Sequence, residues 1–430
     1  MRIPYRSVLV LLAFAGVSAC SGGAGTSSVP HSGPAQPAGQ GRSILAVGGP
    51  TCNVPADYPT IQAAVNVAAC ATIKVAPGTY TENVTIARAL TLNGAQAGHD
   101  ARAPRGAESI VNGGTGPNVT ITANGVTVDG FTLNGPVSQG TAAIVMMGGN
   151  SGETIRNNVV NNPGRAASFN TSNTIFNQNL VVNVFATAGD GFQANSSPIQ
   201  NVVLADNAFR GANGAIYNAD ITIIEGTSNI VVSGNRSTGD GTLAAIFKTH
   251  GATVAGNTVV GDHASSAIYI GGADSNVTVL GNTVSAAGSA VNVANGFGDG
   301  VNSAVTVTKN DLHNNINSVK VGTTAVALPN TVAAHRNRLT GNSGFGVNNL
   351  STFNVDATCN WWGARNGPGP VGPGSGDKVT TNVTFAPWLT SANLNGRCGN
   401  SGGDGGDGGD NGDDGGNGHD GESSEGHDKR

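Results

Sequence analysis

The middle of the chain repeats one pattern of apolar and polar positions. The phrase apolar-x-x-Asn-x-apolar recurs, as in I-R-N-N-V-V (155–160), V-A-G-N-T-V (254–259) and V-L-G-N-T-V (279–284). A second short apolar segment follows most of these asparagines, for example Ala-Ile-Tyr at 267–269. Alternation with a period of two predicts short β-strands. The aligned asparagines, spaced 21 to 28 residues apart, are Asn158, Asn179, Asn207, Asn235, Asn257, Asn282, Asn310, Asn337 and Asn360.

This spacing predicts a stack of similar coils. A propeller blade needs roughly 40–45 residues, and an α-solenoid needs helix-length apolar segments with a 3.6-residue period, which do not occur after residue 70. We therefore predict an all-β fold, a parallel β-helix of about 11–13 coils with isoleucine and valine inside. Asparagine tolerates left-handed backbone, and its amide can bond to an identical neighbour. We expect the asparagines to occupy a bend and to form a ladder.

The two ends of such a stack require covers, because they expose core and unpaired strand edges. The segment 59–70 has the pattern of an amphipathic helix and is expected to cover the N-terminal end. The phrases C-N-W-W-G (359–363) and F-A-P-W-L (385–389) contain all three tryptophans and predict a C-terminal plug. The four cysteines beyond residue 20 allow three pairings. We favour the local one, Cys52 with Cys70 and Cys359 with Cys398, which suits an exported protein.

The N-terminus has the pattern of a secretory signal. Arg2 and Arg6 precede an apolar run, and residues 1–19 are expected to be removed. The phrase V-S-A-C (17–20) resembles the bacterial lipobox, which implies a lipid on Cys20 and anchoring at the outer membrane or cell surface of a bacterium. The alternative is an ordinary signal peptide with a chance cysteine. Residues 20–47 lack large apolar side chains and predict a flexible tether.

Charge divides the rest of the chain into two parts. Only 11% of residues are charged, which excludes a coiled coil, a helical repeat and a basic nucleic-acid-binding protein. The net charge is −5, yet residues 20–398 contain 17 basic and 17 acidic side chains. We expect 48–398 to be the β-helix domain with its caps, and the acidic Gly/Asp-rich segment 399–430 to be disordered. Weak calcium binding by that tail is the alternative.

The repeat resembles the pectin-lyase-like superfamily of right-handed parallel β-helices, over about residues 52–398. The resemblance implies the fold and leaves the chemistry open, because the superfamily includes lyases, hydrolases, esterases, epimerases and non-catalytic members. The segment 78–82 matches the G-x-Y-x-E phrase of pectin methylesterases, but their catalytic phrases are absent. The segments 189–192 and 249–251 are similar to polygalacturonase phrases, but the paired aspartates between them are missing.

Alignment of the coils predicts one outward-facing column of candidate binding residues. Three aromatic side chains would form a ladder at about the 4.8 Å spacing of neighbouring strands. Exposed rings suit the apolar faces of sugars or a partner surface, whereas the alternative is that they only shield the sheet. The column consists of Gln193, Tyr217, Phe247, Tyr269, Asn292, Lys320 and Asn348.

Two aspartates in the preceding loops are candidate catalytic or metal-binding residues. Asp240 and Asp262 each lie five residues after a ladder asparagine, so we expect them to stack, with His263, Lys248 and His250 nearby. The resemblance implies a cleft over this region. Two close carboxylates could share Ca²⁺, the only cofactor the pattern suggests, and a lysine or histidine could act as a base. The alternative is two solvated turn residues.

Three functions are compatible with these observations. The first is a lipid-anchored, non-catalytic scaffold that binds glycans or another cell-surface molecule. The second is a polysaccharide lyase or glycoside hydrolase that acts on acidic polysaccharide through Asp240 and Asp262. The third is an inert structural protein of the envelope. A monomer with no nucleic-acid partner is expected in each case.

Overall fold

The computed structural model describes residues 49–398, apart from 137–140, 183–190, 195–197, 212–218, 240, 296–299 and 323–329. The signal, the tether, the acidic tail and the candidates Cys20, Tyr217 and Asp240 therefore lie outside the described residues, and the statements about them stay predictions. In the described part, no helix is long and apolar enough to cross a membrane.

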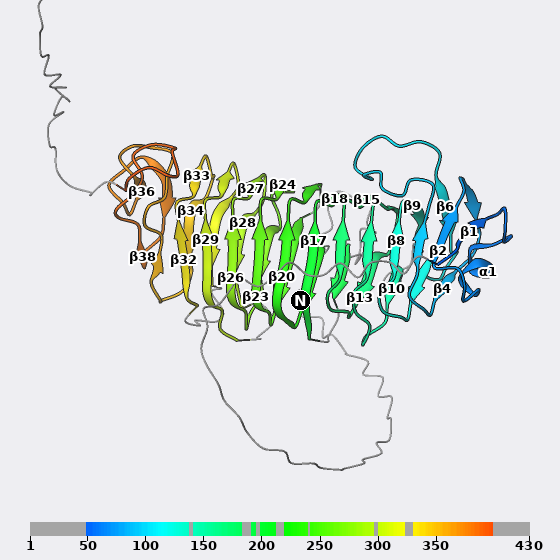
Figure 1. Ribbon diagram of the computed structural model, residues 1–430. Coiled ribbons are helices and arrows are strands. Elements are labelled where there is room, and N and C mark those ends of the chain that lie inside the picture. The colour runs from blue at the N-terminus through cyan, green and yellow to red at the C-terminus, as the bar shows by residue number, and fades with distance from the viewer. Residues whose placement is uncertain are drawn as a thin grey trace, which may run out of the picture. The chain divides into compact units, whose positions relative to one another are not determined.

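The chain is a parallel β-helix, as its repeat predicts (Figure 1). Its described strands form three parallel sheets, here called sheets A, B and C. Sheet A contains β1 (Thr51–Val54), β2 (Thr72–Val75), β5 (Thr91–Asn93), β8 (Thr127–Asp129), β11 (Thr154–Arg156), β14 (Ile175–Asn177), β17 (Ile199–Ala205), β20 (Gly226–Ser233), β23 (His250–Ala255), β26 (Ser275–Leu280), β29 (Ser303–Thr308), β32 (Val332–His335), β35 (Val355–Asp356) and β38 (Val383–Thr384).

Each circuit continues from sheet A through sheet B to sheet C. Sheet B contains β3 (Gly78–Tyr80), β6 (Ser109–Asn112), β9 (Phe131–Asn134), β12 (Val159–Asn161), β15 (Leu180–Val182), β18 (Ala208–Arg210), β21 (Arg236–Thr238), β24 (Thr258–Val260), β27 (Thr283–Ser285), β30 (Asp311–His313) and β33 (Arg338–Thr340). Sheet C contains β4 (Val84–Ile86), β7 (Val119–Ile121), β10 (Ala142–Met146), β13 (Arg165–Phe169), β16 (Phe192–Ala194), β19 (Ala219–Ile224), β22 (Thr242–Phe247), β25 (Ser266–Ile270), β28 (Ser289–Val293), β31 (Asn317–Val321), β34 (Phe345–Asn349), β36 (Pro368–Pro370) and β37 (Gly376–Val379).

The core is the column of apolar side chains enclosed by the three sheets. Isoleucine and valine fill most inward positions, as expected from the alternation. Four phenylalanines form a continuous cluster inside, with ring centroids 4.9 Å, 4.5 Å and 5.4 Å apart along the series Phe169, Phe176, Phe192 and Phe209. Burial of these side chains is the main favourable term that holds the coils together.

The predicted asparagine ladder is confirmed in all nine positions. At each step the backbone N–H and the side-chain amide of one asparagine both donate to the Oδ1 of the next. From Asn257 to Asn282, for example, these distances are 2.9 Å and 2.8 Å. All nine side chains are buried. The stacked asparagine amides therefore satisfy one another's hydrogen-bonding groups at a bend from which water is excluded.

The expectation that the ladder asparagines adopt left-handed backbone is wrong. The residue before each of them does so instead, with φ between 55° and 63°; these residues are Asn157, Gln178, Asp206, Gly234, Gly256, Gly281, Lys309, Arg336 and Cys359. A left-handed residue bends the chain from sheet A into sheet B immediately before the ladder, and the side chain of the following asparagine is buried. The two tasks of the bend are thus divided between neighbouring residues.

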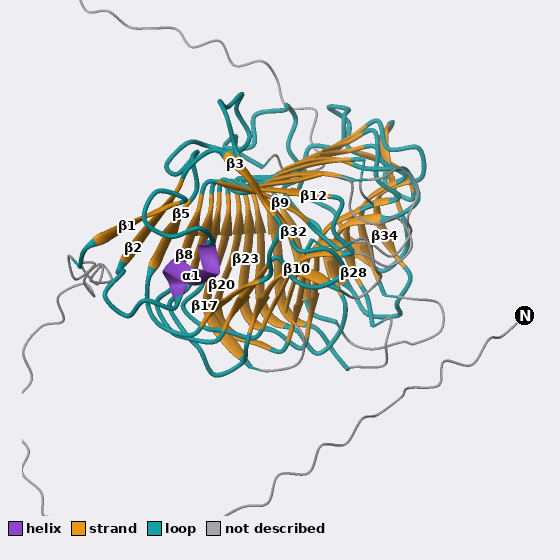
Figure 2. Ribbon diagram, turned by 90° about the vertical axis from the view of Figure 1, so that its right-hand side faces the viewer, coloured by secondary structure: helices purple, strands orange, loops and turns teal. Residues whose placement is uncertain are grey.

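The N-terminal cover is a shorter helix than the sequence predicts. Helix α1 (Ile61–Val65) has five residues rather than the predicted span of 59–70. The Glu82 carboxylate accepts hydrogen bonds from the first two helical N–H groups, at 2.9 Å each. The Arg88 guanidinium donates to the Val65 carbonyl at 3.1 Å, which a longer helix would pair with the N–H of Ala69. Figure 2 shows α1 at one end of the stacked strands.

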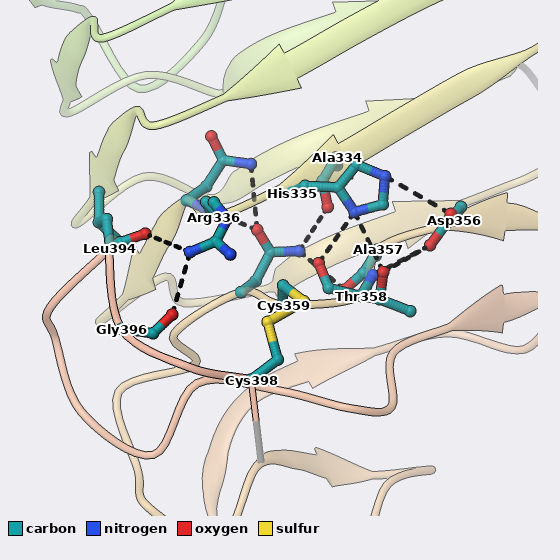
Figure 3. Close-up of a disulfide and its surroundings, with 12 residues drawn as sticks. Ala334, His335, Arg336, Asp356, Ala357, Thr358, Cys359, Leu394, Gly396 and Cys398 are labelled. Atoms are coloured by element: carbon teal, nitrogen blue, oxygen red, sulfur yellow. Dashed lines mark hydrogen bonds and ion pairs between the residues drawn. A yellow bond between two sulfur atoms is a disulfide. The ribbon is translucent and has the colours of Figure 1, made fainter. Parts of the chain in front are cut away.

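Both predicted disulfides are present. Cys52 pairs with Cys70, and Cys359 pairs with Cys398. Figure 3 shows the second bond beside Arg336, whose guanidinium donates to the carbonyls of Leu394 and Gly396 at 3.0 Å each. The C-terminal segment is thus tied to the ladder corner by a covalent bond and by two hydrogen bonds to a charged donor.

Candidate functional site

The outer face of sheet C presents the predicted column with two corrections. Thr222 occupies the column position that was predicted for Tyr217, because Thr222 is the residue in register with Gln193. Tyr269 lies in register with Asn292, and Asn292 with Lys320, as predicted. Phe247 does not share this column, because Ala245 is the residue in register with Tyr269. Over the described residues of sheet C, the column from Gln193 onward reads Gln193, Thr222, Ala245, Tyr269, Asn292, Lys320 and Asn348.

The error at Phe247 comes from unequal turns between sheets B and C. Three residues separate β21 from β22 in the sequence, whereas five residues separate β24 from β25. Counting from the ladder asparagine therefore shifts β22 by two residues relative to β25. Because the side-chain period of a strand is two, the shift keeps Phe247 on the outer face but moves it along the strand.

Phe247 and Tyr269 nevertheless form a ring pair on this face. Their centroids are 5.7 Å apart and their planes are inclined by 49°. Both side chains are half-buried. Gly271 allows this arrangement, because a Cβ at that position would lie 2.1 Å from two ring atoms of Phe247. The absence of a side chain at Gly271 thus leaves room for the Phe247 ring, a role that the sequence pattern does not reveal.

Polar side chains continue the column beyond the rings. The Asn292 amide donates to Ser266 Oγ at 3.0 Å, and the Asn348 amide donates to Asn317 Oδ1 at 3.2 Å. Among the described residues, no donor reaches Oδ1 of Asn292. Lys320 is half-buried between these two asparagines. The outer face of sheet C therefore presents the two aromatic rings, followed along the column by amide groups and the Lys320 ammonium group.

Asp262 stabilises its own turn. Its carboxylate accepts hydrogen bonds from the backbone N–H groups of Ala264 and Ser265, at 2.9 Å and 2.8 Å. Burial raises the pKa of Asp262, but these hydrogen bonds, with that from the Ser265 hydroxyl, outweigh burial and leave the pKa below its usual value. Asp262 is therefore ionised at neutral pH, and its turn accommodates the two additional residues of this loop. His263 follows in left-handed backbone and is exposed.

Lys248 and His250 lie at the opposite end of the sheet C strands from Asp262. A five-residue strand separates the two ends, about 13 Å of extended chain. His250 Nδ1 is 2.8 Å from Ser275 Oγ. Thr249 is buried, and its N–H donates to Asp274 Oδ1 at 2.9 Å. Thr249, from the segment 249–251, is thus part of a second buried ladder that continues through Asp274, Asn302 and Asn330. The sequence pattern did not reveal this ladder.

The calcium prediction depends on Asp240 and so stays a prediction. Within the described ranges, no group of three or more histidine, cysteine, aspartate or glutamate side chains is arranged to hold a metal ion.

Comparisons with known proteins identify the fold alone. No family model matches the chain, and no curated protein matches it. An alginate lyase from Paenibacillus is similar in structure, at 16% identity over 71% of this chain and 98% of that protein, with a TM-score of 0.45. The surface adhesin PfbA of Streptococcus pneumoniae shares 13% identity over 71% of this chain and 92% of its own, with a TM-score of 0.48. The A-module of the Azotobacter vinelandii mannuronan C-5 epimerase AlgE6 shares 15% identity over 74% and 90% of the two chains, also with a TM-score of 0.48.

Proposed function

We propose that the protein is an exported, non-catalytic scaffold that binds a polysaccharide on the outer face of sheet C. The observation that carries this proposal is the Phe247 and Tyr269 ring pair, because Tyr269 is in register with Asn292 and Asn292 with Lys320 on successive coils. Aromatic rings receive the apolar faces of sugar rings, and amide and ammonium groups bind hydroxyls and carboxylates. Neighbouring coils repeat at about 4.8 Å, so the face is long, regular and rigid.

Binding is favoured over catalysis by the positions of the candidate catalytic groups. The Asp262 carboxylate already accepts bonds from its own turn, and Lys248 and His250 lie across a strand from it. A general base must reach the proton it removes within about 3 Å or through one water. The lyase or hydrolase alternative therefore depends on Asp240, which lies outside the described residues.

Export and anchoring belong to the same proposal. The lipobox-like phrase ending at Cys20 and the two disulfides support an oxidising location outside the cytoplasm. We expect Cys20→Ala to release the protein from the membrane fraction of cells that express it. Unchanged membrane association would remove the anchor from the proposal.

The experiment is affinity electrophoresis of the mature protein against a panel of neutral and acidic polysaccharides. Tyr269→Ala and Gly271→Ala should each weaken binding at least about tenfold, the first by removing a ring and the second by displacing Phe247. Phe353→Ala is the matched control, because Phe353 is 41% exposed and lies outside sheet C. Equal binding by all three variants would refute the sheet C site.

An activity assay on the same panel separates the two functions. Release of reducing ends or of unsaturated products by the wild type would show catalysis and contradict a purely binding role. We expect neither product from any polysaccharide that the protein binds.

A further inference from the structure

A second concave surface lies at the C-terminal end of sheet B. It is a groove of about 410 Å³ whose floor is the end of β33 and the residues after Cys359, and whose wall is β37. Its chemically distinctive lining residues are Arg338, Thr340, Trp361, Ser375, Asp377 and Lys378. Its floor belongs to sheet B and its wall, β37, pairs with β34 in sheet C. The groove shares no residue with Phe247, Tyr269, Asn292 or Lys320, so ligand binding in it is independent of the proposed function.

Trp361 is the unusual residue of this groove. Trp362 is fully buried and Trp388 is 9% exposed, so these two tryptophans form the plug, whereas the sequence predicts all three in it. Trp361 is instead half-buried, lines the groove and forms a parallel bridge with Arg338. It continues the outer face of sheet B by one position. A third indole is not needed to close the core, because Trp362 occupies the inward position beside it.

Two cations flank the indole. Arg338 is held in place by Asp311, with a guanidinium–carboxylate distance of 3.2 Å, and Asp311 also contacts His313 Nδ1 at 3.1 Å. Lys378 is exposed on the opposite wall, and the described residues place no carboxylate in an ion pair with it. Asp377, beside it in the chain, accepts hydrogen bonds from the N–H groups of Gly341 and Asn342 at 3.0 Å each, so its carboxylate is already engaged.

The groove is also kept open by its backbone. Gly376 lines it, and a Cβ there would lie 2.4 Å from the carbonyl oxygen of Trp362. The close approach of β37 to the floor thus requires glycine, and no side chain at this position fills the space. The volume lies in the range of small-molecule sites, which begins at about 300 Å³.

We infer that this groove binds a pyranose that carries a carboxylate, the residue type of an acidic polysaccharide. The apolar face of the sugar lies on the Trp361 indole, and its carboxylate pairs with Lys378 and Arg338. Indole supplies a large rigid surface for a sugar face, and charge-assisted hydrogen bonds select a carboxylate over a hydroxyl. Thr340 and Ser375 line the same groove and offer hydroxyl groups to those of the sugar.

The test is calorimetric titration of the mature protein with a trimer of galacturonic acid, repeated by tryptophan fluorescence. Trp361→Ala should weaken binding at least about tenfold, and Trp361→Phe should recover part of it. Lys378→Gln should weaken binding about five- to tenfold, whereas the exposed control Lys309→Gln should not change it. The methyl-esterified trimer should bind the wild type more weakly than the free acid binds Lys378→Gln, because the ester loses its ion pairs with both Lys378 and Arg338.

Two further measurements keep the inference separate from the sheet C proposal. Tyr269→Ala should bind the trimer as tightly as the wild type. Loss of binding in that variant would place the acidic-sugar site on the face that carries Tyr269 and would overturn the proposed groove site. Equal binding by the wild type, Trp361→Ala and Lys378→Gln, or no binding by the wild type, would also overturn it. Circular dichroism and melting temperature of Trp361→Phe and Lys378→Gln confirm that each variant is folded.

Discussion

At the scale of single residues, the most unusual side chain is Glu153. It lies in the inward column of sheet A, where the equivalent residue of the preceding coil is Val126, and it is fully buried. One carboxylate oxygen accepts a hydrogen bond from Thr174 Oγ1 at 3.1 Å, and no donor among the described residues reaches the other. Burial raises the pKa of Glu153, and hydrogen bonds only partly offset the effect. A charge at this position therefore destabilises the folded state.

We predict that Glu153→Gln removes a pH-dependent part of the stability. A folded-state pKa above the unfolded value means that the folded protein binds the proton more tightly, so the wild type gains stability as pH falls through the raised pKa. At pH 8 the variant should melt at a higher temperature than the wild type, with a free energy of unfolding larger by an amount on the order of 1 kcal/mol, and the difference should shrink as pH falls toward 5.

Thermal melts across this pH range are the measurement. The half-buried Glu225, in the variant Glu225→Gln, is the control. A difference between Glu153→Gln and the wild type that stays constant with pH would contradict the idea that a buried charge is its cause.

At the scale of elements, the asparagine ladder could be predicted from the sequence and the position of the rings could not. The ladder depends on the phrase around each asparagine, which is local and repeats. The register of β22 and β25 depends on turns of three and five residues, whose lengths become known only when the strands are paired. The helix was predicted too long because Glu82 and Arg88, far along the chain, determine where it begins and ends.

The environment of Trp361 likewise depends partly on a local pattern and partly on a segment further along the chain. Alternation within one strand would have placed Trp361 and Trp362 on opposite faces, so the exposed indole could have been anticipated. The groove around it could not, because its wall comes from β37 and the sequence pattern of that segment is not periodic.

We predict that Asn282→Ala is among the most damaging single substitutions in the chain. The amide of Asn282 donates to the Val254 carbonyl at 2.9 Å, and its Oδ1 accepts two bonds from Asn257. Its loss leaves the Val254 carbonyl and the Asn257 donors without these partners on the preceding coil, and removes one of the two bonds to Asn310 Oδ1 on the following coil. The free energy of unfolding should fall by roughly 3 kcal/mol or more.

Urea unfolding measures this loss. Asn161→Ala is the control, because the Asn161 amide makes only one exposed bond, to Asn134 Oδ1 at 3.2 Å, and its cost should stay near 0.5 kcal/mol, as for most surface changes. Similar losses for the two variants would show that the buried ladder is not a special source of stability.

At the scale of the whole molecule, stability depends on the closure of two ends. Each coil contacts mainly its neighbours, so a repeat protein can lose its terminal coils first. Helix α1 with the Cys52–Cys70 bond covers one end, and Trp362 and Trp388 with the Cys359–Cys398 bond cover the other. The two covers differ in composition, but each shields the apolar core at its end of the stack from water.

We predict that Cys398→Ser lowers the melting temperature and loosens the C-terminal end before the rest. The bond closes a segment with a sequence separation of 39, and its loss should cost roughly 2–4 kcal/mol. Hydrogen exchange should increase first in β35, β38 and the plug, while β20 and β23 stay protected. Uniform loss of protection along the stack would show instead that the molecule unfolds as one unit.

The division of the bend into a left-handed residue and a ladder asparagine has a consequence for how such a chain can change in length. Every step of the ladder uses the same donors and acceptors, so the coil before a given asparagine and the coil after it are interchangeable as neighbours. Loss or duplication of the stretch from one ladder asparagine to the next removes or adds one strand in each sheet and leaves matching bonds at the junction. The residue just before the asparagine, which is Gly, Asn, Asp, Gln, Lys, Arg or Cys at different coils, can vary without changing this joint. The architecture can therefore lengthen or shorten by whole coils while its outer faces diverge.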